Sequence, residues 1–160
     1  MKNLKAVLAK TFQTNSFLLN KAVKDMSDEH ITKRPNDNTN PIQFLIGHIT
    51  LYRYHACKLL GNEMKYKHTE HFQMGAQPKD ASNYPSVAEM VAEWNVISKK
   101  LDDILESSSE EDLANAFEHK YPIGEQNIGG AMSFIMFHES YHIGQIAYIR
   151  KFMGYDTLVG

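Results

Sequence analysis

The chain has 160 residues, and its 17 Lys+Arg against 19 Asp+Glu give a formal net charge of -2. A chain of this length forms one domain, here residues 1–160. It buries roughly 70% of its unfolded surface, so it needs no disulfide or structural metal. No basic stripe and no apolar run of membrane-spanning length is present, which excludes nucleic acid and membrane as expected partners. The single cysteine, Cys57, excludes an internal disulfide and indicates a cytoplasmic location.

Hydrophobic periodicity predicts four long helices and no strand. Apolar side chains recur at helical spacing in each segment, and charged side chains take the intervening positions. The segments are residues 2–26, 41–60, 86–106 and 127–153. Helices of this length are typical of bundles. The sequence therefore predicts an all-α fold, a four-helix bundle of the up-and-down type with long cross-connections.

Residues with known capping preferences stand at the ends of these segments. Small polar residues favour helix N-termini, whereas glycine favours the position after a C-terminus. The predicted caps are Asn40 with Pro41, Ser86 with Glu89, and Asn127 at N-termini, and Gly61 and Gly154 at C-termini. These residues support the boundaries that the periodicity indicates.

The connections differ in length. Residues 27–40 are predicted to be a loop, and residues 61–85 form the longest connection, with a short helical turn near 64–73. A connection of this length often shapes a site or a dimer contact. His68 and His71 within it are expected to be exposed to solvent.

The last predicted helix carries His138 and His142, four residues apart. This spacing puts both imidazoles on one helix face, with Cβ atoms about 5–6 Å apart. Two rings so placed can share a metal ion at about 2 Å from each nitrogen. Apolar neighbours such as Ile135 and Ile146 indicate a buried face, where each ring nitrogen needs a partner. An exposed helix face would explain the pair without a metal.

A third ligand is expected from a facing helix, because a catalytic site of the zinc type uses three protein ligands and keeps one position open. His48 is the best candidate. It lies in the middle of a predicted helix beside the apolar stripe, next to Gly47, which would let another helix approach closely. His55 is the second choice. The alternative for His48 is a core histidine bonded to a backbone carbonyl or a tyrosine.

Residues 138–154, HESYHIGQIAYIRKFMG, resemble the last-helix signature of the DinB/YfiT-like family. Residues 41–55, PIQFLIGHITLYRYH, are similar to the helix of that family that carries an upstream histidine. The order and spacing agree over nearly the whole chain. The resemblance implies a four-helix bundle, a homodimer, and a divalent metal held by His48, His138 and His142. One Zn²⁺ or Ni²⁺ per chain is expected, although imidazoles also suit Cu and Fe.

A three-histidine site with an open position lowers the pKa of a bound water or thiol. The resemblance implies a metal-dependent S-transferase acting on small electrophiles, with a low-molecular-weight thiol such as bacillithiol, mycothiol or glutathione as cosubstrate. The alternatives are a metal-dependent hydrolase and a non-catalytic metal- or ligand-binding bundle. No catalytic residue is assigned, and Cys57 is expected to be a buried hydrophobic side chain. Candidates for contacts to the ligands or to substrate, with ordinary packing as the alternative, are Tyr52, His55, Tyr141 and Gln145.

Overall fold

The computed structural model describes residues 3–76 and 80–159, which form helices joined by loops. The long helices are α1 (Leu4–Val23), α3 (Ile42–Leu59), α5 (Val87–Ser107) and α7 (Ile128–Phe152). The short ones are α2 (Asp28–Thr32), α4 (Thr69–Phe72), the 3-10 turn η1 (Ala81–Asn83) and α6 (Glu110–Ala114). Within the described ranges there is no strand, and one isolated antiparallel bridge joins Ala116 to Asn127. The prediction of an all-α chain with four long helices is confirmed.

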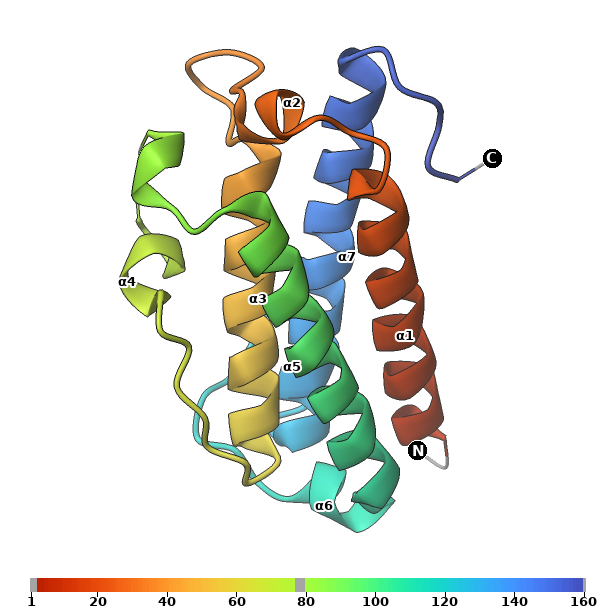
Figure 1. Cartoon of the computed structure of the whole chain (residues 1–160). Helices are drawn as coiled ribbons and strands as arrows, with labels where there is room; N and C mark the ends of the chain where they lie inside the picture. Colours follow the sequence, from red (N-terminus) through yellow and green to blue (C-terminus); the bar gives the residue numbers. More distant parts are fainter. Residues whose placement is uncertain (1–2, 77–79, 160) are drawn as a thin grey trace.

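The four long helices pack as a bundle (Figure 1). Helix α3 packs against α5 and α7, and α1 packs against the same two helices. Helices α1 and α7 run in one direction, and α3 and α5 run in the other. Because α3 and α5 are parallel, the connection between them runs back along the outside of α3 and carries α4 against it. This connection is one of the long cross-connections that the sequence predicts.

Most of the predicted helix caps are present. The Ser86 and Glu89 side chains form a capping box at the start of α5, and the Asn127 side chain accepts a hydrogen bond from the Gly130 amide. Gly61 and Gly154 follow α3 and α7 with φ of 77° and 89°, backbone values that favour glycine. They end their helices as predicted.

The predicted cap of α3 is wrong. The N-cap position is occupied by Pro41, not Asn40, and no side chain bonds there. Gln43 is buried and donates a hydrogen bond to the Pro85 carbonyl instead, 3.1 Å away. The start of α3 is thus held by a tertiary contact to the segment before α5.

Two further local predictions fail in the connections. Residues 27–40 contain the short helix α2, which begins because the Ser27 hydroxyl accepts a hydrogen bond from the His30 amide. His71 is not exposed to solvent: its side chain is only 20% accessible, and its ring lies edge-on to Phe72 and Tyr84. Aromatic packing in the long connection decides this burial, and helical periodicity gives no signal for it.

The core is built from the apolar faces of the four long helices. Trp94 and Phe12 are fully buried in it, and Cys57 is fully buried as well, as predicted for a small hydrophobic side chain. In the described part of the chain, no helix combines the length and hydropathy required to cross a membrane.

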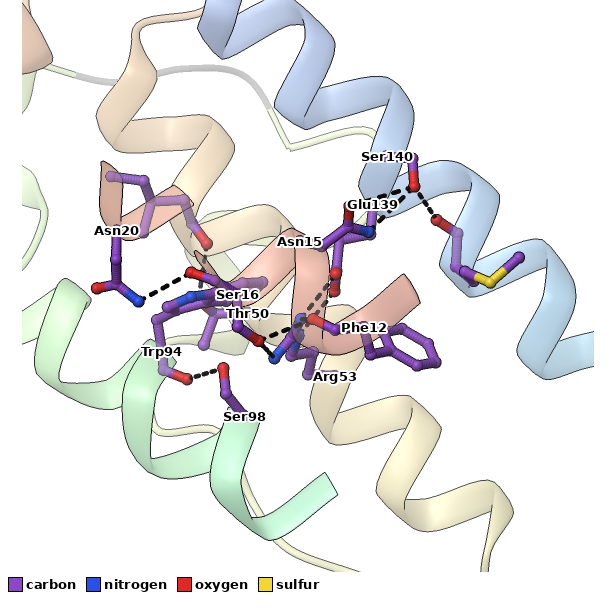
Figure 2. Close-up of polar contacts among 12 residues, drawn as sticks. Phe12, Asn15, Ser16, Asn20, Thr50, Arg53, Trp94, Ser98, Glu139 and Ser140 are labelled. Atoms are coloured by element: carbon purple, nitrogen blue, oxygen red, sulfur yellow. Dashed lines mark hydrogen bonds and ion pairs between the residues drawn. The ribbon is translucent and has the colours of Figure 1, made fainter. Parts of the chain in front are cut away.

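One ion pair inside the core ties all four long helices together (Figure 2). Arg53 of α3 donates from Nε and Nη2 to the two carboxylate oxygens of Glu139 on α7, at 2.7 and 2.8 Å. From α1, the Ser16 hydroxyl and the Phe12 carbonyl accept hydrogen bonds from the same guanidinium, at 2.8 and 2.9 Å. The guanidinium carbon lies 3.8 Å from the ring centroid of Trp94 on α5.

This cluster fixes how α3 and α7 are aligned. Arg53 and Glu139 are both completely buried, so each requires the other. Glu139 directly follows His138 in the sequence, and Arg53 lies five residues after His48. The ion pair therefore aligns the two helices close to the histidines that they carry.

Candidate metal centre

His48 of α3 and His138 and His142 of α7 converge on one point between the two helices. The Nε2 atom of His138 lies 3.1 Å from that of His48 and 3.0 Å from that of His142. In the described ranges these three residues form the one group of three side chains suited to hold a metal ion. The structure thus brings together the three histidines that the sequence singles out, and His55 is not among them.

The spacing of these nitrogens fits a shared metal ion. Two imidazole nitrogens bound about 2.1 Å from one ion, at angles of about 90–110°, are about 3.0–3.4 Å apart. The two Nε2 distances from His138 fall at the short end of this range. The three residues are half-buried, so the group is not sealed from solvent.

Hydrogen bonds to the other ring nitrogens fix the orientation of two histidines. The Nδ1 atom of His48 lies 2.6 Å from the Phe72 carbonyl oxygen, which can only accept, so Nδ1 carries the proton. The Nδ1 atom of His142 lies 2.7 Å from Oε1 of Gln145, whose amide nitrogen donates to the Tyr141 hydroxyl. In both neutral rings, Nε2 therefore presents a lone pair to the centre.

The third histidine cannot satisfy both lone pairs. Neutral His138 can donate one proton from Nε2, to one neighbour only, so the lone pair of the other neighbour has no donor. Burial lowers the pKa of His138 to about 3 and that of His142 to about 4, and it also lowers the pKa of His48. For His138, the neighbouring imidazoles add to this lowering. These rings therefore bind a proton poorly, whereas a metal cation would accept a lone pair from each of the three.

The surroundings of His48 explain its position. A Cβ atom on Gly47 would overlap the ring of Phe72, so the glycine lets α4 pack against α3. The Phe72 carbonyl is then placed to accept from His48. The sequence predicts that Gly47 lets another helix approach closely, and the helix that does so is the short α4. Sequence reasoning missed Phe72, because it acts through a backbone carbonyl that carries no side-chain signal.

The sequence profile of the DinB superfamily matches residues 12–146, which is most of the chain and includes all three histidines. The chain belongs to the DinB superfamily. Among solved structures, it is similar to YfiT from Bacillus subtilis, with 14% identity, a TM-score of 0.73, and coverage of 98% of this chain and 91% of that one. YfiT is described as a probable metal-dependent hydrolase with an unusual four-helix bundle topology. At this identity the likeness shows the fold. No curated protein matches the chain.

The other residues predicted to contact the metal ligands or the substrate of this DinB-superfamily protein lie around the three histidines at different distances. The Tyr52 ring covers that of His138, with centroids 4.1 Å apart, and Gln145 bonds His142 as described. Tyr141 is 55% exposed and reaches His142 through Gln145. His55 lies beyond Tyr52, at 5.4 Å between ring centroids, and faces outward.

Two cavities flank the centre of this DinB-superfamily protein. The first, called here the amide-lined cavity, has a volume of about 630 Å³ and lies on the Gln145 side of His142. It is lined in part by Asn38, Asn40, Tyr141, Gln145 and Tyr148. The second, called here the aromatic cavity, has a volume of about 500 Å³ and lies on the Tyr52 side of His138. It is lined in part by Tyr52, His55, Met74, Tyr121 and Phe134.

Proposed function

We propose that His48, His138 and His142 hold one divalent metal ion per chain, Zn²⁺ or Ni²⁺, and that the protein is a metal-dependent enzyme. The observation that carries this proposal is the position of the three Nε2 atoms: that of His138 lies 3.1 Å from that of His48 and 3.0 Å from that of His142. The hydrogen bonds at Nδ1 leave a lone pair on Nε2 of both His48 and His142. When bound, a divalent ion at such a site lowers the pKa of a coordinated thiol or water. The residues of the chain supply orientation and shape.

Each of these contributions can be assigned to named groups. The Phe72 carbonyl and the Gln145 amide hold the rings of His48 and His142 in one tautomer and one orientation. Tyr52 covers one face of His138 and restricts the access of water from that side. The two cavities leave room for two different small molecules beside the centre.

We propose thiol S-transfer to a small electrophile as the activity. A low-molecular-weight thiol such as bacillithiol, mycothiol or glutathione would release its proton to solvent water, and its sulfur would bond to the electrophilic carbon. The leaving group would depart from that carbon with the electron pair of the broken bond. Membership of the DinB superfamily and the presence of two cavities beside the histidines support this assignment.

Hydrolysis by activated water is the second candidate. The description of YfiT as a probable metal-dependent hydrolase favours it. A third possibility is a bundle that binds metal or ligand without catalysis. Turnover requires a thiol and a metal in the first case and a metal alone in the second, and it is absent in the third.

The first test is metal content. Purified protein is expected to carry about one Zn²⁺ or Ni²⁺ per chain by plasma mass spectrometry, and His138→Ala is expected to lose it. His119→Ala is the matched control, because His119 is exposed in the loop before α7. Folded protein that takes up no divalent metal would contradict the proposal.

The second test separates the two enzymes. Metal-loaded protein is incubated with monochlorobimane and each of the three thiols, and separately with a p-nitrophenyl ester. Turnover that depends on one thiol and on His138 supports S-transfer. Ester hydrolysis that depends on His138 and needs no thiol would favour hydrolysis.

We also propose that the protein is a homodimer. Helix α7 exposes an aromatic stripe at positions that share one helix face, with Phe137 55%, Tyr148 73% and Phe152 63% accessible. A second copy of the chain would cover this stripe. Light scattering should give twice the mass of the chain, and Phe152→Glu should lower it; a monomeric wild-type protein would contradict this proposal.

A further inference from the structure

We propose that the aromatic cavity binds an uncharged, planar aromatic compound, the electrophile of the proposed reaction. The inference rests on the proposed function only for the role of the bound compound, because binding itself requires the cavity and not the metal. Its volume of about 500 Å³ lies within the range of small-molecule sites, about 300–1,000 Å³.

The cavity lies one aromatic ring away from the candidate metal centre. Two of its lining residues, Tyr52 and Phe134, also flank the imidazole of His138, with ring centroids 4.1 and 6.1 Å from it. A compound held in the cavity is therefore separated from a metal ligand by one ring.

The rings beside the cavity form a nearly parallel row. Phe117 and Tyr121 are inclined by 3°, Tyr121 and Phe134 by 23°, and Phe134 and His138 by 24°. The row leads from the loop before α7 to the metal centre. The Tyr121 and Phe134 rings stack on each other at 4.8 Å between centroids, so a flat ring that enters the cavity meets the row at ring edges. Aromatic rings prefer such edge-to-face contacts as well as offset stacking.

The charge of the lining decides which compounds fit. None of the lining residues is Asp, Glu, Lys or Arg; besides the aromatic rings, the walls carry Leu51 and Met74 and the uncharged polar side chains of Thr69 and Gln73. The one imidazole of the lining, His55, has its pKa lowered by burial, so it offers a carboxylate no positive charge at neutral pH. Burying a charge without a partner is costly, so a carboxylate or ammonium group is disfavoured. The polar groups can still orient a nitro or carbonyl oxygen.

The amide-lined cavity has a different character. Its walls include Asn38, Thr39, Asn40 and Ser140, which offer hydrogen bonds and no parallel stack of rings. It suits a polar molecule. Its residue Tyr148 is an exposed tyrosine on the same helix as Phe134, and it provides a matched control for the loss of one aromatic ring.

The experiment uses 1,3-dinitrobenzene, a flat and uncharged compound with no leaving group, and 3,5-dinitrobenzoate, which adds a carboxylate to the same ring. Binding is measured by titration calorimetry on the full chain, once after removal of metal with a chelator and once loaded with Zn²⁺. The location is read from the NMR signal of the Met74 methyl group, which lines the cavity and is assigned with Met74→Leu.

We expect 1,3-dinitrobenzene to bind in both metal states and to shift the Met74 methyl signal. The carboxylate should bind at least tenfold more weakly. Tyr121→Leu, which keeps apolar bulk, and Phe134→Ala should each weaken binding roughly tenfold, whereas Tyr148→Ala should leave it unchanged. Circular dichroism checks that each variant is folded. If Phe134→Ala does not fold, Tyr121→Leu alone still provides the test.

Three results would overturn the inference: no binding of the neutral ring, equal binding of the carboxylate, or a loss with Tyr148→Ala equal to that with Tyr121→Leu. The proposed function fails separately. If the protein takes up no metal or turns over no substrate, yet 1,3-dinitrobenzene binds with this pattern, the cavity assignment stands and the enzymatic one falls.

Discussion

Replacing Glu139 by glutamine removes one charge from the buried ion pair with Arg53 and leaves the size of the side chain unchanged. Both side chains are 0% exposed, so water does not screen the charge that remains. Removing one partner of a buried pair costs about 3–5 kcal/mol. Glutamine keeps one acceptor oxygen for the guanidinium, so we expect the lower end, about 3 kcal/mol.

A loss of about 3 kcal/mol lowers Tm by roughly 6–12 °C in a chain of this size. The double variant Arg53→Met with Glu139→Leu removes both charges and should recover most of the lost stability, because no unpaired charge is buried. The Phe12 carbonyl is not left unsatisfied there, since the Ser16 hydroxyl also donates to it. Urea unfolding of metal-free protein measures all three free energies.

The same variants test whether the ion pair aligns the histidines. We expect Glu139→Gln to weaken Zn²⁺ binding at least about tenfold in a chelator competition, because α7 loses its fixed alignment with α3. Asp103→Asn is the control: it breaks the exposed pair with Lys99 and should change neither quantity measurably. A loss of less than about 1 kcal/mol in Glu139→Gln, or no gain in the double variant, would refute the reasoning.

Three other predictions concern the close approach at Gly47, the buried histidines and the buried cysteine. Gly47→Ala should destabilise the protein by about 1–3 kcal/mol in urea unfolding, because the new Cβ overlaps the ring of Phe72; an unchanged midpoint would contradict this close approach. Metal-free protein should lose stability as the pH falls from about 6.5 towards 4, because the folded state holds the pKa of His138 and His142 well below the unfolded value, so the unfolded chain binds more protons. A flat stability profile over that range would count against neutral buried rings. Burial raises the pKa of Cys57 to about 11, so native protein should not react with Ellman's reagent at pH 8, and full reaction within minutes would place the thiol at the surface.

Much of the fold could be predicted from the sequence because helix formation here depends on local signals. The apolar spacing of each long helix, the capping box of Ser86 and Glu89, and the glycines after α3 and α7 all act within a few residues of the ends that they define. The pairing of His138 with His142 could be predicted in the same way, because the helical repeat alone places them on one face. The helical repeat alone does not decide between His48 and His55, since that choice depends on which face of α3 meets α7.

Contacts between distant segments decided the rest. The Phe72 carbonyl, which orients His48, belongs to a four-residue helix 24 positions along the chain and leaves no trace in the pattern of side-chain types. The row of rings beside His138 joins α7 to the loop before it. Arg53 and Glu139 are ordinary charged residues in the sequence and become the centre of the core only when four helices surround them. The sequence by itself determined which long segments are helical and which histidines share a face, because those properties repeat with the helix. The tertiary structure alone decided how the rings are oriented, what partners they have and what space lies beside them, because these depend on contacts between residues far apart in the chain.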